Sequence, residues 1–433
     1  MLRGIATIRR DPLAFLAEQW RAHGDVVQFP IPAPPTYLVS HPADVRQVLV
    51  GRARDTGKDT LQYRALSQVT GLGLLTSDGE RWREHRRVLQ PAFHPSTLPG
   101  VAEHTTDAAQ GLVDRLLGAP GSSVVDLDAA VMALALEVVG ESLFGHALGP
   151  VADRLAAATL TALGEVVALA RMPLRAPRWV PTPGNRRMTG ALAELDAAVA
   201  AILEQRHAQG PSDPPRMVDL LLASELSQRA VRDEIVTFLV AGHETVASAL
   251  TWALVLLGGQ PAIADAVAAE AVQVLGPDPG VRPGPDLGSL AKLELARAVV
   301  DEAMRLHPPA WLITRRTSAD LTLGGCAVPA GSLVVISPWL VHRHPSAWPD
   351  PDAFDPERFR DPGNAASVRA AFLPFGAGPR MCIGRDFAYA EAVLALAMVC
   401  RAVRFAPTGA PVRALPLVTI RPDRPVFMRI TAR

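Results

Sequence analysis

The sequence predicts a mainly α-helical fold with small β-sheets, in a single domain that covers residues 1–433. Apolar residues recur at helical spacing along most of the chain, and strand-like runs occur near its two ends. No internal repeat or low-complexity linker divides the chain. Its residues are 49% hydrophobic, which is enough to bury one large core.

The first half of the chain begins with an expected helix at residues 11–23 and two short strands at 26–29 and 36–39. Residues 171–187 are rich in proline and arginine, which predicts a surface connection between two helices. Further helices in this half are expected at residues 42–50, 79–90, 101–117 and 127–144.

The second half contains a long predicted helix at residues 229–257. A helix at residues 261–275 has proline in its first turn, and a helix at 293–306 ends before two prolines. Strand-like runs at residues 321–323 and 332–337 flank a Gly/Pro turn, so we expect a hairpin. The chain then runs through a proline-punctuated loop at residues 345–374.

Charge and cysteine content exclude several classes of protein. Lys+Arg and Asp+Glu both number 43, so nothing indicates a nucleic-acid or anionic-membrane partner. Three cysteines provide neither a disulfide framework nor a zinc site and fit a reducing cytoplasm. The N-terminus lacks a signal peptide, and the longest apolar stretch, residues 246–257, is shorter than the roughly 20 residues that span a bilayer. We expect a soluble, cytoplasmic, bacterial monomer without a membrane anchor.

The segment FGAGPRMCIG, residues 375–384, gives Cys382 features that suit a thiolate ligand of haem iron. Glycines let backbone N–H groups approach the sulfur, and the start of a helix favours thiolate over thiol. Arg380 can pair with a haem propionate, and thiolate ligation favours O–O cleavage. The alternative is a buried structural cysteine after a glycine-rich turn.

The pattern F-x-x-G-x-R-x-C-x-G resembles the haem-binding signature of the cytochrome P450 monooxygenases. The resemblance implies haem b as the cofactor and Cys382 as the ligand of its iron. It also implies that the cofactor contacts the residues around this cysteine, namely Phe375, Gly376, Arg380 and Gly384.

The segment AGHET, residues 241–245, lies within the long predicted helix. A mid-helix glycine costs about 1 kcal/mol relative to alanine, and close approach of a flat ligand to the backbone is one reason for it. The segment resembles the family motif A-G-x-[DE]-T. The resemblance implies that Ala241 contacts the haem, that Thr245 hydrogen-bonds the oxygen ligand and that Glu244 belongs to the proton relay. A capping or surface pair is the alternative, although apolar residues flank the motif.

Trp82 and Arg86 stand four residues apart on one helical face. They resemble the W-x-x-x-R helix of the family, which implies that both contact haem propionates; an exposed basic helix is the alternative. Arg315 resembles a further propionate ligand of the family, and Arg316 is the alternative candidate for this role. We expect His85 to belong to the basic face of the same helix, with contact to the haem edge as the alternative.

Glu302, Arg305 and Arg358 resemble the E-x-x-R and P-E-R-F segments of the family. The resemblance implies a buried charge triad that fixes the loop before the cysteine. An exposed i,i+3 pair is the alternative for the first two residues, since that spacing alone is weak evidence.

The resemblance also assigns walls of the substrate pocket, and the residues that this chain supplies there are largely aliphatic. An apolar lining favours a lipophilic substrate such as a terpenoid, a fatty-acid-like molecule or an intermediate of secondary metabolism. Core packing is the alternative for each of these side chains. They are Leu72, Leu74, Leu75, Phe238, Ala241, Ala310, Leu312 and Ile313.

The preferred hypothesis is a haem-thiolate monooxygenase that uses O2 and two electrons from a separate ferredoxin and ferredoxin reductase, because no reductase domain follows the cysteine motif. The outward residues Arg81, Arg83 and Arg87 are candidates for docking an acidic ferredoxin, with a solvated charge run as the alternative. Competing functions are a peroxide-driven peroxygenase or isomerase and a haem-binding sensor without turnover. A cysteine hydrolase is disfavoured, because no motif suggests a histidine base.

Overall fold

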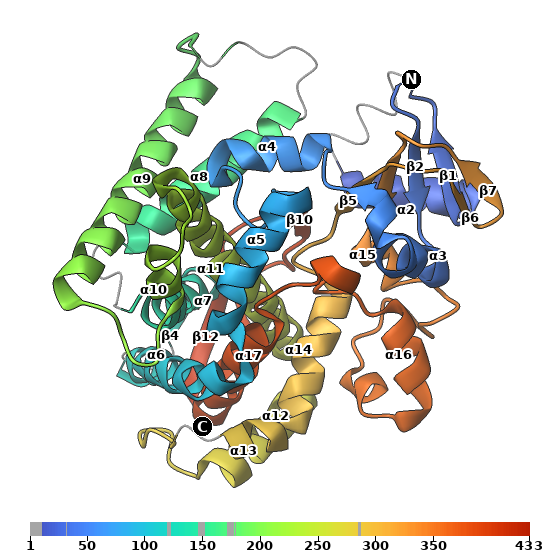
Figure 1. Cartoon of the computed structure of the whole chain (residues 1–433). Coiled ribbons are helices and arrows are strands. Elements are labelled where there is room, and N and C mark those ends of the chain that lie inside the picture. Colours follow the sequence, from blue (N-terminus) through green and yellow to red (C-terminus); the bar gives the residue numbers. More distant parts are fainter. Residues whose placement is uncertain are drawn as a thin grey trace.

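The computed structural model describes residues 11–31, 33–118, 123–145, 152–170, 177, 179–284 and 287–433. Helices form most of the molecule, and the largest sheet lies to one side of the helical body (Figure 1). This arrangement confirms the predicted fold class, mainly helical with small sheets.

The longer helices account for most of the body. They are α2 (Pro12–His23), α4 (Leu61–Thr70), α5 (Gly79–Leu89), α6 (Leu98–Gly118), α7 (Leu127–Val139), α8 (Ala152–Ala170), α9 (Pro183–Gln209), α11 (Gln228–Gly258), α12 (Pro261–Leu275), α14 (Glu294–Leu306) and α17 (Arg385–Ala402). Shorter helices are α3 (Pro42–Arg46), α10 (Met217–Leu222), α13 (Leu287–Lys292), α15 (Pro338–Val341) and α16 (Ala365–Ala371).

The largest sheet has the strand order β1-β2-β8-β5-β3, with β2 and β8 parallel and its other pairs antiparallel. Its strands are β1 (Val26–Phe29), β2 (Thr36–Val39), β8 (Leu333–Ile336), β5 (Ile313–Thr317) and β3 (Thr56–Gly57). A second sheet has the order β4-β12-β9, formed by Ser123–Asp126, Phe427–Ala432 and Val403–Pro407. Two hairpins are formed by β6 (Leu321–Leu323) with β7 (Cys326–Val328), and by β10 (Ala414–Pro416) with β11 (Ile420–Pro422).

The predicted hairpin between residues 321–323 and 332–337 is wrong. Gly324 and Gly325 both have positive φ, 53° and 78°, which closes a tight two-residue turn directly after β6. Strand β6 therefore pairs with β7, and β8 lies in the largest sheet between β2 and β5.

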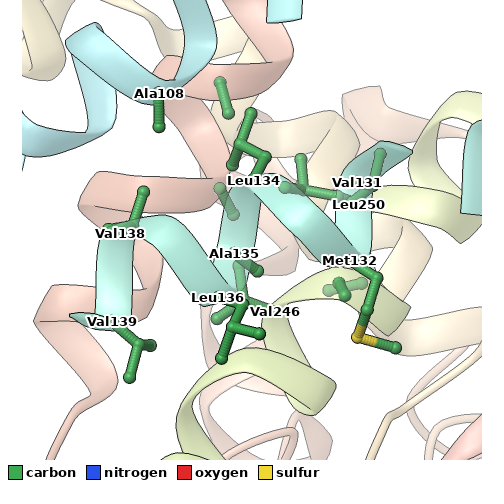
Figure 2. Close-up of a cluster of buried hydrophobic side chains, with 14 of the residues drawn as sticks. Ala108, Val131, Met132, Leu134, Ala135, Leu136, Val138, Val139, Val246 and Leu250 are labelled. Carbon is green, nitrogen blue, oxygen red and sulfur yellow. The ribbon is translucent and has the colours of Figure 1, made fainter. Parts of the chain in front are cut away.

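Helix α11 forms the centre of the core, where it packs against α7, α14 and α17. Helix α7 is apolar around most of its circumference, as expected for a helix buried on several sides. Figure 2 shows side chains of α7, among them Val131, Ala135 and Val139, next to Val246 and Leu250 of α11.

We expected that no apolar stretch is long enough to span a membrane, and this is wrong, because the helix α11 is long and apolar enough to cross a bilayer. Its most apolar window is nevertheless 72% buried inside the protein, which accounts for the hydropathy by core packing. The predicted buried core helix at residues 229–257 is confirmed.

The predicted connection at residues 171–187 is shorter than expected at its C-terminal end. Helix α9 begins at Pro183, with Thr182 as its N-cap accepting a hydrogen bond from the backbone N–H of Asn185. Residues 171–176 and 178 lie outside the described residues. Helix α4 was not predicted from the sequence, although Thr60 caps its first turn.

Candidate active site

One internal cavity brings together the sequence-predicted site residues from distant parts of the chain. It lies between α11, α5, β5 and the segment that contains the cysteine. Every predicted site residue except Glu244 contributes to its lining: Trp82, Arg86, Ala241, Thr245, Arg315, Phe375, Gly376, Arg380, Cys382 and Gly384.

The cysteine loop holds Cys382 at the start of α17. The Cys382 backbone N–H donates to the carbonyl of Phe375 over 3.0 Å, and Gly384 is the N-cap of the helix. Gly376 and Gly378 adopt φ values of 70° and 71°, which favour glycine. A Cβ on Gly378 would also lie 2.1 Å from the carbonyl oxygen of Leu49, so this backbone approach requires glycine.

The Cys382 thiol is accessible from the cavity and otherwise surrounded by protein. Burial raises its pKa, while the Gly384 N–H and the guanidinium groups of Arg86 and Arg385 act in the opposite direction. The predicted preference for thiolate is therefore not supplied by the polypeptide alone. A coordinated cation deprotonates a thiol outright, so an iron ligand is the role in which this sulfur becomes a thiolate.

Four cationic side chains line the cavity beside the cysteine loop: Lys58, Arg86, Arg315 and Arg380. None of the described lining residues is a carboxylate. An apolar cavity that presents one thiol and an excess of positive charge suits a flat apolar ligand with a metal centre and two carboxylates. The donor set therefore fits haem, as predicted from the cysteine motif.

The predicted propionate residues are linked to one another and to the cysteine loop. The guanidinium of Arg380 lies over Trp82, with Cζ 3.8 Å from the ring centroid, and it pairs with the carboxylate of Asp78. Arg86 donates to the carbonyl of Met381 over 3.1 Å. Arg315 lines the cavity and donates to the hydroxyl of Tyr63 over 3.2 Å.

Arg316 is not among the described lining residues, because successive side chains of β5 point to opposite faces of the strand. Between the two competing arginines, the structure thus brings Arg315 to the cavity.

The cavity face of α11 carries Ala241, Gly242 and Thr245. The Thr245 hydroxyl donates to the Ala241 carbonyl over 2.7 Å. A Cβ on Gly242 would lie 2.9 Å from Cγ2 of Val139, so packing of α7 against α11 already requires the glycine. Gly242 also lines the cavity, so close approach of a flat ligand to this backbone stays a prediction.

Glu244 lies outside the cavity lining, buried against the C-terminal hairpin. Its Oε1 accepts a hydrogen bond from the Thr419 hydroxyl over 2.8 Å and lies 3.7 Å from Nε of Arg421. Its Oε2 is buried and has no hydrogen-bond partner among the described residues. Burial raises the pKa of this carboxyl, and Arg421 and Thr419 partly offset the effect. Glu244 is thus adjacent in sequence to a cavity residue and holds its proton more tightly than an exposed glutamate.

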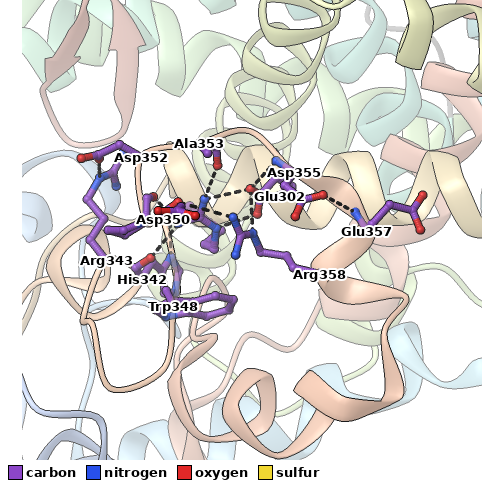
Figure 3. Close-up of polar contacts among 12 residues, drawn as sticks. Glu302, His342, Arg343, Trp348, Asp350, Asp352, Ala353, Asp355, Glu357 and Arg358 are labelled. Atoms are coloured by element: carbon purple, nitrogen blue, oxygen red, sulfur yellow. Dashed lines mark hydrogen bonds and ion pairs between the residues drawn. The ribbon is translucent and has the colours of Figure 1, made fainter.

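The predicted charge triad is confirmed and braces the loop before the cysteine (Figure 3). Arg305 donates to both Glu302 carboxylate oxygens, over 2.6 and 2.8 Å, and Arg358 donates to Oε1 over 3.1 Å. Arg305 also donates to the carbonyls of Pro351 and Ala353. Both side chains of the Glu302–Arg305 pair are fully buried within α14. The ion pair of Glu302 with Arg358 and the hydrogen bonds of Arg305 to the loop carbonyls connect the helix to the loop in a low-dielectric interior.

Most of the predicted pocket walls reach the cavity, namely Leu74, Leu75, Phe238, Ala241, Ala310 and Ile313. Two predictions are wrong. Leu72 is 47% exposed on the surface, and Leu312 packs against the separate hydrophobic cluster that contains Leu13 and Trp311.

Sequence reasoning misassigned His85 and overlooked Lys58. His85 is buried, and its Nδ1 contacts the Glu234 carboxylate of α11 rather than belonging to the basic face of α5. Its position three residues after Trp82 and one before Arg86 gives no signal of this pairing. Lys58 lies in the cavity lining but precedes all the recognised motifs. The signal available was its rarity, since Lys292 is the only other lysine of the chain.

A family model and individual known proteins each match nearly the whole chain. The family model described as "Cytochrome P450" matches residues 5–425. Cyclooctatin synthase of Streptomyces melanosporofaciens is 35% identical, over 95% of this chain and 89% of the relative. Cyclooctat-9-en-7-ol 5-monooxygenase of the same organism is 35% identical, over 92% and 86%. Pentalenene oxygenase of Streptomyces avermitilis is 33% identical, over 98% and 94%.

Among solved structures, CYP175A1 from Thermus thermophilus superposes with a TM-score of 0.79 at 34% identity, covering 98% of this chain and 96% of that one. A six-coordinated cytochrome P450 of the same species gives a TM-score of 0.75 at 33% identity, covering 97% and 98%.

Proposed function

The chain belongs to the cytochrome P450 family of monooxygenases, and from this premise we propose that it uses haem b, held by Cys382, to oxidise a lipophilic cyclic terpenoid. The observation that supports the cofactor assignment is the cavity in which one thiol, four cations and an otherwise mostly apolar lining converge. The names of the relatives support the substrate class, because they denote oxidation of cyclooctat-9-en-7-ol and pentalenene.

Thiolate-ligated haem, when bound, supplies O–O cleavage and C–H oxidation. The side chains that line the cavity have two further roles, which are to hold the cofactor and to bind the substrate. Arg86, Arg315 and Arg380 hold the carboxylates of the cofactor, while Trp82 packs against Arg380. Leu74, Phe238 and Ile313 provide apolar surface that excludes water and binds a hydrocarbon skeleton with little directional demand.

Thr245 presents the hydroxyl that orients a proton on the cavity side of α11. Glu244 is the proton donor next to it, because its carboxyl has a raised pKa and one oxygen without a hydrogen-bond partner among the residues described above. A side-chain rotation of Glu244 away from Thr419 would deliver that proton toward Thr245.

The electrons come from a separate ferredoxin and its reductase. A separate ferredoxin needs a docking surface near the cysteine. Arg81, Arg83 and Arg87 are exposed on α5 and form a basic surface that suits an acidic ferredoxin. Reversal of all three charges should slow ferredoxin-driven reduction and weaken its salt dependence; an unchanged rate would remove this surface from the proposal. We further propose that the protein acts in the cytoplasm as a monomer.

The substrate class is tested by adding cyclic terpene hydrocarbons and alcohols to the ferric protein and following the low- to high-spin shift. Compounds that bind are then incubated with NADPH, a surrogate ferredoxin system and 18O2, and the product is analysed by mass spectrometry. The proposal predicts one labelled oxygen atom in the product. Binding without product would indicate a sensor, and product formed with hydrogen peroxide but not with NADPH would indicate a peroxygenase.

A further inference from the structure

Tyr389 of α17 lies between the cofactor cavity and a second, outer cleft. This cleft has a volume of about 1010 Å³ and lies between α13, α14, α17 and the cysteine loop. Tyr389 is buried and contributes to the lining of both spaces. Its ring packs on that of Phe375 with the centroids 5.0 Å apart, and the Phe375 carbonyl accepts the backbone N–H of Cys382. A short path of contacts therefore joins the cysteine to the Tyr389 phenol and to the outer cleft.

The phenol of Tyr389 has a proton acceptor in direct contact. Its hydroxyl donates to Oδ1 of Asp301 over 2.6 Å, and Oδ2 of the same carboxylate accepts from Nε of Arg297 over 2.9 Å. A separation of 2.6 Å lies within the range of charge-assisted O–H···O⁻ bonds, about 2.5–2.7 Å. Asp301 also lines the outer cleft, so the proton donor and its acceptor form one pair at the edge of this cleft.

The charges around the pair keep the proton on the phenol. Burial and the negative charge of Asp301 raise the pKa of the Tyr389 phenol. Burial also raises the pKa of the Asp301 carboxyl, and Arg297 and the phenol act in the opposite direction. The proton moves to Asp301 once an electron has left the ring, because an oxidised phenol is a strong acid. The Arg297 guanidinium, with Cζ 3.2 Å from the ring centroid, opposes the loss of that electron, and the carboxylate favours it.

The chain has three tyrosines, and the contacts described for the other two differ. Tyr63 lines the same cavity, but its hydroxyl accepts a hydrogen bond from Arg315, and Nζ of Lys58 lies 4.9 Å from its ring centroid. These two cations oppose the loss of an electron from Tyr63. Tyr37 is buried in β2 and is not among the described lining residues of the cavity. Tyr389 thus combines ring contact toward the cysteine with a carboxylate acceptor for its proton.

We propose that Tyr389 is a redox-active residue, which removes oxidising equivalents from the haem site when no substrate is oxidised. The inference rests on the proposed haem site and adds to it an activity that needs no substrate. When a hydroperoxide oxidises the haem-loaded protein, Tyr389 gives one electron to the cofactor through Phe375 and Cys382, and its O–H bond breaks. Asp301 takes the proton. The products are a neutral tyrosyl radical, a protonated carboxyl and a cofactor that is reduced by one electron.

The outer cleft provides the way back to the resting state, because Tyr389 lines it. A small one-electron reductant in solution, for which ascorbate is the probe, returns an electron to the ring from this side. Asp301 then returns the proton to the phenolic oxygen. Without this route the same oxidising equivalents attack side chains of the cavity lining, among which Trp82 and Met304 are oxidisable.

The first test is electron paramagnetic resonance of the haem-loaded, substrate-free protein, frozen directly after mixing with peracetic acid. Wild type that contains ring-deuterated tyrosine should give a narrower radical signal than unlabelled protein, which identifies the radical as tyrosyl. Tyr389→Phe keeps the ring that packs on Phe375 and should lose this signal. Tyr37→Phe is the matched control and should keep it, as should Tyr63→Phe. A tyrosyl signal that survives in Tyr389→Phe would overturn the proposal, as would its absence from a wild type with thiolate-type haem.

A second measurement tests the role of Asp301 as proton acceptor. Asp301→Asn keeps a hydrogen-bond acceptor but removes the base, so the radical should form more slowly than in wild type. The wild-type rate should also fall in D2O, because a proton moves together with the electron. The solvent comparison needs no substitution and therefore tests proton transfer even where Asp301→Asn does not fold. Equal rates in H2O and D2O would contradict transfer of the proton to Asp301.

A third measurement follows damage by successive additions of peracetic acid in the presence of ascorbate and without substrate. Wild type should survive more additions than Tyr389→Phe before its Soret absorbance is lost, and its peptides with Trp82 and Met304 should carry less added oxygen. Ascorbate should extend the survival of wild type but not that of the variant. Equal damage in the two proteins would overturn the protective role. Absence of thiolate-type haem binding in the wild type would instead contradict the proposed function, so the two failures are distinguishable.

Discussion

The Thr419 hydroxyl donates to the Glu244 carboxylate over 2.8 Å, which holds that carboxyl outside the cavity lining. The neighbouring Thr245 lies in the cavity lining. If the two residues form a proton relay, Glu244→Gln should lower kcat by about 100-fold, within the range for loss of a proton donor. Thr245→Ala should lower the yield of product per NADPH consumed.

Thr245→Ser is the matched control for the relay, because it keeps the hydroxyl and should retain most of the coupling. The measurement is oxygen, NADPH and product stoichiometry under one set of conditions. An unchanged kcat in Glu244→Gln would show that protons reach the cavity by another route.

Gly242 and Val139 are predicted to be coupled through helix packing. In Gly242→Ala the new Cβ lies 2.9 Å from Val139 Cγ2. Overpacking of this kind lowers the free energy of unfolding by about 1–3 kcal/mol. The higher helix propensity of alanine offsets this loss by up to about 1 kcal/mol. The double variant Gly242→Ala/Val139→Ala should be more stable than the sum of the single effects predicts. Urea unfolding of all four proteins measures the coupling; strict additivity would count against this packing role.

The charge triad is predicted to support stability rather than chemistry. Glu302→Gln leaves Arg305 and Arg358 buried without their counter-ion, which should cost about 3–5 kcal/mol in the free energy of unfolding. Glu357→Gln is the control in the same segment, because its pair with Arg360 is exposed and worth about 0–1 kcal/mol. Similar losses in the two variants, measured by denaturant unfolding, would refute a special role for the buried pair.

Glu391 of α17 should make stability depend on pH. Its carboxyl is fully buried, and in the part of the chain that the structure describes neither oxygen has a hydrogen-bond partner. Burial raises its pKa well above the ordinary value. Below the unfolded pKa of about 4.3 the carboxyl is protonated in both states. Above it the unfolded chain releases the proton and the folded protein keeps it, so stability falls by about 1.4 kcal/mol per pH unit until the folded pKa is reached.

Glu391→Gln removes this contribution. The variant should therefore gain stability over wild type as the pH rises from 5 to 8, in denaturant unfolding at a series of pH values. A difference between the two proteins that does not change with pH would contradict the raised pKa.

Much of the fold could be predicted from local signals in the sequence. Proline in the first turn of α12 and capping by Ser227 at the start of α11 mark helix ends within a few residues. Pairing between distant strands carries no such signal. Strand β8 lies parallel to β2, almost three hundred residues earlier, and only the tight turn at Gly324 and Gly325 excludes β6 as its partner.

The same limit applies to the site. Cys382, Arg86 and Thr245 could be predicted because each belongs to a short motif with fixed spacing. Lys58 could not, since its importance depends on three arginines from other segments that meet only in the folded chain. Nor does the sequence show that Glu244 turns toward Thr419, because that contact joins α11 to the C-terminal hairpin.

The central claim, thiolate ligation of haem by Cys382, is tested most directly by the absorption spectrum of the reduced carbon monoxide complex. Wild type should show the red-shifted Soret band of thiolate ligation, and Cys382→Ser should lose it while Cys400→Ser, at a buried cysteine remote from the cavity lining, should retain it. A folded, haem-loaded wild-type protein without that band, or a Cys382→Ser variant that keeps it, would contradict the account.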